Sequence, residues 1–358
     1  MSTSSIANYQ RKIRVFYPLT RGSMVLRTES DWGHNLEPEA NEDGTMFEFT
    51  VASERPFLYF KPCVIDADTV HWSAGMNNLA VLSEPGSRDI YPFFHSRQVG
   101  AITSVLEFDS TLLGRSHRLR VYLPAGYEEN TLKRYPVLYM QDARNLFFPE
   151  EAFLGTEWQV DETLDLLEAM NVIDRVIVVG VYAENRDEEY TKPGYEQYGR
   201  ALVEEVKPFI DERFRTLHAP SHTGVMGSSL GGVVSFFLAW QWPEVFGRAV
   251  CMSSSFTRKD DLIERVINEP QRNIKVYLDS GWPGDNYEVT LSMCMALIER
   301  GYLFGRDFFY FVFPHASHNE TSWGTRCHLP LQLFSGEAIK AMLHARNVLN
   351  PGLEWRSK

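Results

Sequence analysis

The stretch Gly227-Ser228-Ser229-Leu230-Gly231 decides how this chain is interpreted. It lies between a short apolar run at residues 224–226 and a longer one at residues 233–240, which predict a strand before it and a helix after it. In such a strand–turn–helix, the flanking glycines avoid collisions within the turn, and the serine hydroxyl is exposed above the sheet. The pattern therefore predicts a nucleophile elbow and an acyl-transfer reaction at Ser229. The alternative is a glycine- and serine-rich loop that matches by chance.

The sequence from residue 136 onward alternates between strand and helix patterns. Compact apolar or β-branched runs predict buried parallel strands, and runs with a helical period predict the helices between them. Such alternation gives an α/β fold with a doubly wound, mostly parallel sheet and right-handed crossovers. The predicted strands are 136–140, 175–180, 224–226, 249–252, 275–278 and 308–313, and the predicted helices are 160–170, 198–214, 233–240, 289–300 and 336–346.

The first hundred residues have a different pattern. Short alternating stretches, separated by polar turns with glycine and proline, predict a small all-β sandwich. Residues 102–108 and 118–123 then predict a hairpin of edge strands. We therefore predict two domains, an all-β sandwich at residues 1–100 and an α/β domain at residues 101–358. The alternating stretches are 23–27, 46–51 and 57–60.

A serine nucleophile needs a neighbouring base, which in this kind of sheet is a histidine in a loop that follows a late strand. His315 and His318 both follow the predicted strand 308–313. We favour His318, because a short turn after the strand lets it swing back over the sheet. His328 is predicted to lie in a loop that no strand positions, and His344 on the surface of the last helix.

The acid that orients the histidine is expected after the predicted strand 275–278. Asp279 continues that strand and fits a structural, hydrogen-bonded carboxylate. Asp285 lies beyond Gly281-Trp282-Pro283-Gly284, a loop that is able to bend toward the histidine. We prefer Asp285 as the triad acid and keep Asp279 in reserve.

An oxyanion hole needs two backbone N–H groups that point at the developing negative charge. One is expected from Leu230, the residue after the nucleophile. The other is expected from the turn that follows the strand 136–140, from Ala143 or Arg144. Asp142 in the same turn has a structural alternative, which is to cap the following segment.

Composition and charge limit the possible partners. The chain has 358 residues and a formal net charge of −12, which argues against nucleic acid or an anionic membrane as a partner. No segment approaches the roughly 20 apolar residues that span a bilayer, and the N-terminal residues do not predict a signal peptide. The four cysteines have no paired spacing, so we expect a reduced, cytoplasmic protein without disulfides. His315 and His318 with Glu320 are too few ligands for a metal site, so no metal or other cofactor is predicted.

Residues 118 to about 345 resemble the putative-esterase family of α/β-hydrolases, which includes enterochelin, feruloyl and acetyl-xylan esterases. The resemblance implies Ser229 as nucleophile, His318 as base and the acid in the loop that holds Asp285. One stretch departs from the family, which often has Asp-Gly-Gln-Asn where this chain has Asp142-Ala143-Arg144-Asn145. Ala143 thus replaces the glycine. Arg144 becomes a candidate contact to an anionic or hydroxylated substrate. The matching pieces are Val121–Pro124, Tyr135–Phe147, Asn185-Arg186, Glu189-Tyr190, Gly227–Gly232, Pro243–Gly247 and His318–Trp323.

The first hundred residues resemble, more weakly, the early-set immunoglobulin-like or starch-binding-like modules that precede some of these esterases. The residues that carry this likeness are Asp31-Trp32, Phe60-Lys61-Pro62 and Trp72–Asn77. Trp32 and Trp72 could stack on sugar rings, although such tryptophans more often fill the core of a small sandwich.

Together these features predict a serine carboxylic-ester hydrolase. The expected substrate is a small ester, such as an acylated sugar or a siderophore lactone, and a homodimer is a further expectation. The alternatives are an acyltransferase with the same triad and a non-catalytic binding protein. Candidate substrate contacts are Asp142, Arg186, Trp282 and Trp323, although loop tryptophans, Trp158 among them, also serve as packing plugs.

Overall fold

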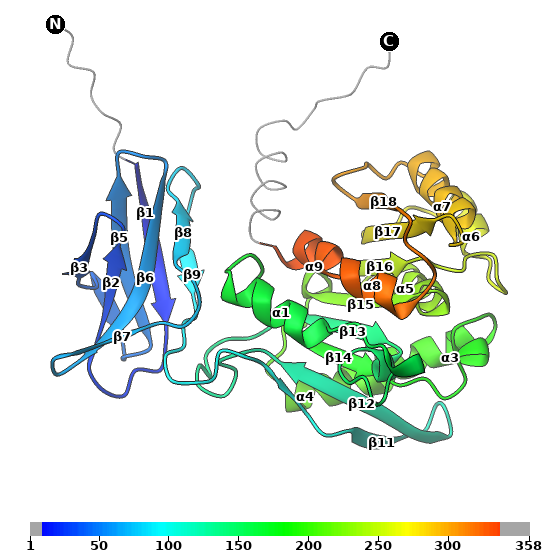
Figure 1. Ribbon diagram of the computed structural model, residues 1–358, viewed down its shortest axis with the longest axis horizontal. Helices are drawn as coiled ribbons and strands as arrows, with labels where there is room; N and C mark the ends of the chain where they lie inside the picture. Colours follow the sequence, from blue (N-terminus) through cyan, green and yellow to red (C-terminus); the bar gives the residue numbers. More distant parts are fainter. Residues whose placement is uncertain (1–8, 337–358) are drawn as a thin grey trace, which may run out of the picture. The chain divides into compact units, whose positions relative to one another are not determined.

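A computed structural model describes residues 9–336 (Figure 1). Within this range the chain forms two compact units. The first unit extends to Gly100 and also holds Pro124–Lys133 and Glu168–Asn171, and the remaining described residues form the second unit. That residues 1–100 and 101–358 are separate domains stays a prediction. The predicted helix at 336–346, with His344, lies outside the described residues.

The part of the first unit before Gly100 is all β, as predicted, and consists of two sheets. One has the order β4-β5-β1-β9 and the other the order β3-β2-β6-β7, with β8 beside β6. Alternate side chains of these strands form a single apolar core, which includes Phe47, Phe49 and Phe60. The strands are β1 (Tyr9–Phe16), β2 (Ser23–Thr28), β3 (Asp31–Leu36), β4 (Ala40–Glu42), β5 (Met46–Ser53), β6 (Phe57–Asp66), β7 (Thr69–Trp72), β8 (Asn78–Val81) and β9 (Arg88–Ile90).

Trp32 and Trp72 of this unit do not form a flat platform. Their rings are 6.2 Å apart and inclined at 62°. Arg27 lies over the Trp72 ring at 5.1 Å, so one face of that ring already has a cationic partner. Neither tryptophan belongs to the apolar core of the sandwich.

The second unit is built on one sheet with the order β10-β12-β14-β13-β15-β16-β17-β18, and β11 also pairs with β12. All pairs from β14 to β18 are parallel, which confirms the predicted α/β fold. The strands are β10 (Ala101–Ile102), β11 (Leu106–Ser110), β12 (Arg115–Leu123), β13 (Val137–Gln141), β14 (Ile177–Val181), β15 (Thr223–Ser228), β16 (Arg248–Met252), β17 (Lys275–Trp282) and β18 (Phe308–Pro314).

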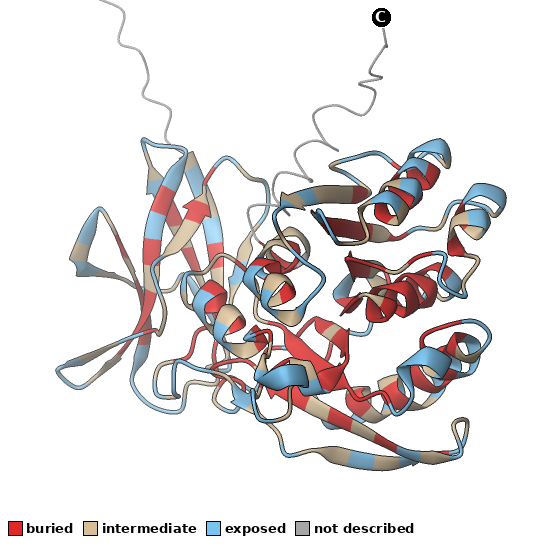
Figure 2. Cartoon of the chain, turned by 45° about the vertical axis from the view of Figure 1, so that its right-hand side comes forward, coloured by how far each residue is buried: buried red, intermediate tan, exposed pale blue. Residues whose placement is uncertain are grey.

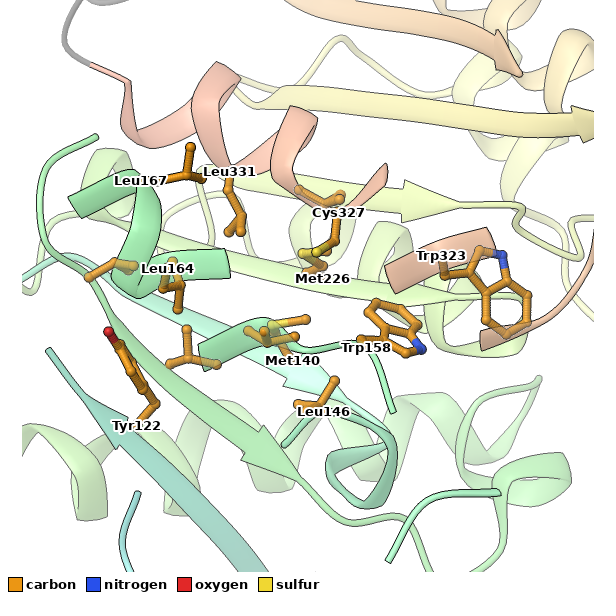
Figure 3. Packing of buried hydrophobic residues seen from close by; sticks show 14 of the residues in the cluster. Tyr122, Met140, Leu146, Trp158, Leu164, Leu167, Met226, Trp323, Cys327 and Leu331 are labelled. Carbon is orange, nitrogen blue, oxygen red and sulfur yellow. The ribbon is translucent and has the colours of Figure 1, made fainter. Parts of the chain in front are cut away.

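Helices cover both faces of this sheet. Helix α5 is buried along almost its whole length (Figure 2). On the opposite face, α1, α8 and α9 pack on the sheet through a cluster that includes Leu164, Cys327 and Leu331 (Figure 3). The helices are α1 (Val160–Ala169), α2 (Arg186–Glu189), α3 (Gly194–Ala201), α4 (Lys207–Arg213), α5 (Leu230–Gln241), α6 (Leu262–Asn268), α7 (Tyr287–Glu299), α8 (Glu320–Arg326) and α9 (His328–Ser335).

Two predicted elements differ from the structure. The hairpin of residues 102–108 and 118–123 is formed by β11 and β12, but β12 also pairs with β14 and is therefore not an edge strand. The helix predicted at 198–214 begins at Gly194 and has a π-helical segment at Leu202–Val206 between α3 and α4. Burial explains the earlier start, because Tyr195 stacks on Phe237 of α5 with ring centres 3.9 Å apart.

His117 on β12 is a buried histidine near the charged side chains of Arg115 and Glu205. It is 0% exposed and stacks on Phe108 at 5.7 Å. Neither ring nitrogen has a hydrogen-bond partner among the described residues. Burial, helped by the charge of Arg115, lowers the pKa of His117 to about 4.

We therefore expect His117 to make the fold acid-sensitive. The unfolded chain takes up this proton below a pH of about 6.5, whereas the folded chain takes it up only near 4, so stability is lost as the pH falls between these values. His117→Phe should remove up to about 3 kcal/mol of that loss. Urea unfolding of both proteins between pH 7 and pH 4 measures the difference. Identical pH dependence of His117→Phe and the parent protein would contradict the assignment, and the exposed His315→Gln serves as the control.

Candidate active site

Ser229 occupies the turn between β15 and α5 in a backbone conformation that few residues adopt. Its φ is 55° and its ψ is −121°. A Cβ on Gly227 would lie 2.5 Å from the backbone of Gly231, and one on Gly232 would lie 2.1 Å from Ser254 Oγ. The glycines around Ser229 are therefore required by the close approach of strand, turn and helix, as a nucleophile elbow demands.

The loop after β18 brings a histidine to this serine. His318 Nε2 lies 2.9 Å from Ser229 Oγ. His315, in contrast, is exposed, has a φ of 67°, and donates its backbone N–H to the Trp282 carbonyl. His328, predicted to lie in a loop, is instead the first residue of α9. Of the histidines considered after the nucleophile, His318 is the one that the described structure places at Ser229.

Asp285 forms a hydrogen bond with the second ring nitrogen of His318. The Oδ1 atom of Asp285 lies 2.7 Å from His318 Nδ1 and also accepts the backbone N–H of Asn286 at 2.8 Å. Its Oδ2 atom accepts the backbone N–H of Gly281 at 2.6 Å and lies 2.5 Å from Ser253 Oγ. Burial alone would raise the pKa of this carboxyl, but these hydrogen bonds outweigh burial and hold the pKa well below its usual range.

Ser253 connects Asp285 to a buried polar network. A serine hydroxyl has one proton to donate and two lone pairs to accept with. Trp323 Nε1 donates to Ser253 Oγ at 3.0 Å and Arg326 Nη2 donates to it at 2.6 Å. Both lone pairs are then used, so the single proton of Ser253 must point to Asp285.

These contacts also fix the proton on the histidine. Because an ionised carboxylate can only accept hydrogen bonds, the contact between Asp285 Oδ1 and His318 Nδ1 requires a proton on Nδ1, which His318 donates. In the neutral imidazole Nε2 is then an acceptor, and the Ser229 hydroxyl donates to it. This is the tautomer that a general base needs at a serine nucleophile.

Asp279, the reserve candidate for the acid, has a different environment. It is 0% exposed and accepts Arg326 Nε at 3.1 Å and Arg326 Nη2 at 2.9 Å. Tyr277 also donates to it at 2.8 Å. Asp279 is thus the buried partner of Arg326, whereas Asp285 contacts the histidine.

The candidate oxyanion donors lie at the starts of two helices. Leu230 begins α5 and Ala143 begins the 3₁₀ helix η1 (Ala143–Asn145) that follows β13. Backbone N–H groups in the first turn of a helix have no acceptor within that helix, so they are free to bind an anionic oxygen. The two helix starts are adjacent, because a Cβ on Gly231 would lie 3.1 Å from Asp142 Oδ2. Arg144 is exposed.

Asp142 pairs with Arg186 instead of capping the following helix. It occupies the N-cap position of η1 without a side-chain capping bond, so the alternative of a capping role is wrong. Its carboxylate accepts Arg186 Nε at 2.7 Å and Nη2 at 3.0 Å, and its φ of 59° is left-handed. Glu320 lies in the same region, where Asn145 Nδ2 donates to it at 3.4 Å. Burial and the negative charge of Asp142 raise the pKa of Glu320 against the opposing effect of Arg186.

The three tryptophans of the candidate loops have different positions. Trp282 is the last residue of β17 and is 53% exposed, so a ligand can reach it. Trp323 lies in α8, not in a loop, and is buried beside Trp158 at 6.0 Å (Figure 3). The Trp323 ring also meets the His318 ring at 4.9 Å and 83°. Trp323 therefore packs against the His318 ring as a buried residue. The expectation that it lies in a loop is wrong.

The sequence interpretation missed the polar residues that surround the triad. Ser253 and Ser255 directly follow β16, the neighbour of the elbow strand, and that position was a usable signal. Asn286 follows the acid and donates Nδ2–H to the Ser253 carbonyl at 2.8 Å. Arg326 lies in a helix and had no signal in the sequence.

The described residues contain no group of three or more histidine, cysteine or acidic side chains positioned to hold a metal ion. All four cysteines are buried and free. No helix in residues 9–336 has both the length and the apolar character needed to cross a membrane.

Comparison with known proteins identifies the family. The family model described as "Putative esterase" matches residues 110–300, more than half of the chain. The chain belongs to the putative esterase family. The description of the family is that of esterases, enzymes that hydrolyse carboxylic esters.

Curated relatives cover parts of the chain. An uncharacterized protein of Bacillus subtilis strain 168, YbbA, is 26% identical over 39% of this chain and 58% of its own length. An endo-1,4-beta-xylanase/feruloyl esterase of Xylanibacter ruminicola is 29% identical over 45% of this chain and 22% of its own length. The chain thus spans less than two thirds of either relative.

Solved structures share the fold. A ferulic acid esterase superposes with a TM-score of 0.57 at 17% identity, over 66% of this chain and 98% of its own. The enterobactin esterase FES from Shigella flexneri superposes with a TM-score of 0.55 at 14% identity, over 93% of this chain and 94% of its own. The second similarity therefore includes the N-terminal β structure.

The buried network gives a stability prediction. Arg326→Ala would leave the Asp279 carboxylate buried without its cation, and we expect a loss of about 3–5 kcal/mol in the free energy of unfolding. The matched control is Arg258→Ala, because Arg258 and Asp187 form an exposed pair at 3.4 Å. That change should cost less than about 1 kcal/mol. Urea unfolding measures both, and equal losses would contradict the role given to Arg326.

Proposed function

We propose that this protein hydrolyses carboxylic esters through an acyl-enzyme on Ser229. One observation carries the proposal, namely the continuous chain of hydrogen bonds from Ser229 Oγ to His318 at 2.9 Å and from His318 to Asp285 at 2.7 Å. A serine hydroxyl is a weak nucleophile alone, and this arrangement supplies the base and the group that orients it.

Acylation begins when Ser229 Oγ attacks the ester carbonyl carbon. The hydroxyl proton moves to His318 Nε2 as the C–O bond forms, and the ionised Asp285 stabilises the resulting imidazolium. The N–H groups of Leu230 and Ala143 or Arg144 are the proposed donors to the negative oxygen of the tetrahedral intermediate. When the intermediate collapses, the bond to the alcohol breaks and His318 returns the proton to the leaving oxygen.

Deacylation repeats these steps with water. His318 Nε2 takes a proton from the attacking water, and a second tetrahedral intermediate forms. Its collapse breaks the bond between the carbonyl carbon and Ser229 Oγ, to which His318 delivers the proton. The acid is released and Ser229 is restored, so no cofactor is consumed.

Hydrolysis is favoured over transfer to another alcohol. The side chain of His318 is 32% exposed, so water reaches the atom that must activate it. Closing an active site against water is one way in which enzymes prevent hydrolysis of a reactive intermediate. A binding protein without catalysis has no need for the tautomer that the network around Asp285 imposes on His318.

The proposed substrate is a small ester, such as an acylated sugar or a siderophore lactone. The names of the similar proteins, ferulic acid esterase and enterobactin esterase, support this class. Arg186, whose side chain is about half exposed, and the exposed Trp282 are the proposed polar and aromatic contacts. Asp142 holds Arg186 in place and is an indirect contact in this proposal. A cytoplasmic homodimer stays a prediction.

The nucleophile is tested by covalent labelling. A fluorophosphonate probe should react with the parent protein and with Ser254→Ala, but not with Ser229→Ala. Gel fluorescence and peptide mass spectrometry locate the label. Labelling of the Ser229→Ala variant at the rate of the parent protein would contradict the proposal.

The acid is tested by two isosteric changes. Asp285→Asn should lower kcat by about 10³- to 10⁴-fold with the fold intact, because the amide no longer imposes the required tautomer on His318. Asp279→Asn should mainly lower stability, because it removes the charge opposite Arg326. Turnover of a short-chain nitrophenyl ester and urea unfolding are measured for both. The reverse pattern would make Asp279 the acid.

A further inference from the structure

Ser255 contacts the proposed nucleophile but has no part in the triad. It lies in the loop after β16, and its Oγ is 3.1 Å from Ser229 Oγ. Its backbone N–H also donates to the Ser229 carbonyl at 3.2 Å. Two contacts to the same residue hold the Ser255 hydroxyl beside the reacting oxygen.

The direction of the hydroxyl–hydroxyl bond follows from the neighbouring donors. Asn286 Nδ2 has two protons, and its two partners are the Ser253 carbonyl at 2.8 Å and Ser255 Oγ at 2.9 Å. Ser255 Oγ is therefore an acceptor from Asn286. Since the proton of Ser229 is committed to His318, only the Ser255 proton is available between the two hydroxyls. Ser255 donates and Ser229 Oγ accepts.

We propose that Ser255 is a further catalytic residue, which donates a hydrogen bond to Ser229 Oγ when this oxygen leaves the acyl group. The proposal rests on the serine mechanism proposed above. In the collapse of the second tetrahedral intermediate, the electron pair of the breaking C–O bond moves to Ser229 Oγ and His318 supplies the proton. Ser255 keeps its own proton throughout and stabilises the charge that develops on the oxygen.

The effect is larger for deacylation than for acylation. In the free enzyme the Ser255 hydrogen bond already exists, so acylation starts from a ground state that it stabilises. In the acyl-enzyme, Ser229 Oγ is an ester oxygen and a poor acceptor. The hydrogen bond then strengthens only as the C–O bond breaks. An interaction that is stronger in the transition state than in the ground state accelerates the step.

The position of Asn286 links this donor to the triad. Asn286 donates its backbone N–H to Asp285 Oδ1 and its side-chain N–H to Ser255 Oγ. One loop after β17 therefore holds both the acid that orients His318 and the amide that orients Ser255. Ser229 Oγ has two partners, the Ser255 hydroxyl and the His318 imidazole. Two adjacent residues orient them, Asn286 for the hydroxyl and Asp285 for the imidazole.

The experiment is pre-steady-state hydrolysis of p-nitrophenyl acetate by the parent protein and by Ser255→Ala, Ser254→Ala and Ser229→Ala. Loss of a hydrogen bond to a developing charge should slow deacylation by about 10- to 100-fold. In Ser255→Ala we therefore expect a burst of nitrophenolate followed by a slow steady rate. kcat and KM should fall by the same factor and kcat/KM should stay within about twofold, because deacylation does not enter kcat/KM.

Ser254→Ala is the matched control. Ser254 is the neighbouring buried serine, and its hydroxyl has no hydrogen-bond partner among the described residues. It should behave like the parent protein. A purely structural role for Ser255 would lower kcat/KM together with kcat, and that result would overturn the proposal. A Ser255→Ala variant with the kcat of the parent protein and no larger burst would also overturn it. Activity of Ser229→Ala at the parental level would instead refute the proposed function itself.

Discussion

The constraint on which the site depends is the set of four hydrogen bonds that converge on the Asp285 carboxylate. Two come from backbone N–H groups, one from His318 and one from Ser253. A carboxylate that accepts so many donors stays ionised and cannot turn away from the imidazole. The orientation and tautomer of His318 follow from it, and the unprotonated Nε2 then accepts the hydroxyl proton of Ser229. In the proposed chemistry, Asp285 thus orients His318, and His318 in turn activates Ser229.

The sheet explains why these groups meet. The strands from β13 to β18 are parallel, so the residues that follow them gather at one edge. The loop after β15 supplies Ser229, the loop after β16 supplies Ser253 and Ser255, and the loops after β17 and β18 supply Asp285 and His318. The pair of Arg326 and Asp279 fills the interior behind them, and Ser253 joins this pair to the acid. The loops that hold the proposed triad are thereby anchored in a buried network.

The α/β fold and the three triad candidates could be predicted from the sequence because each depends on local rules. An elbow needs glycines around Ser229, and a histidine and an acid are expected after particular strands. The environment of Asp285 could not be predicted, because Ser253 and Arg326 are distant in the sequence and meet it only after folding. The pairing of Asp142 with Arg186 of α2 could not be predicted for the same reason, because the two residues are 44 positions apart in the sequence. Burial also moved the start of a helix to Gly194, where Tyr195 packs on α5.

The proposed chemistry depends most directly on the single tautomer that the Asp285 carboxylate imposes on His318. Nitrogen-15 NMR of the protein labelled at histidine measures this directly, with the His318 signals assigned by their loss in His318→Gln. We predict a proton bound to Nδ1 and an unprotonated Nε2 in the neutral imidazole. A neutral His318 with its proton on Nε2 would contradict the proposed mechanism, because Ser229 would then have no base to receive its proton.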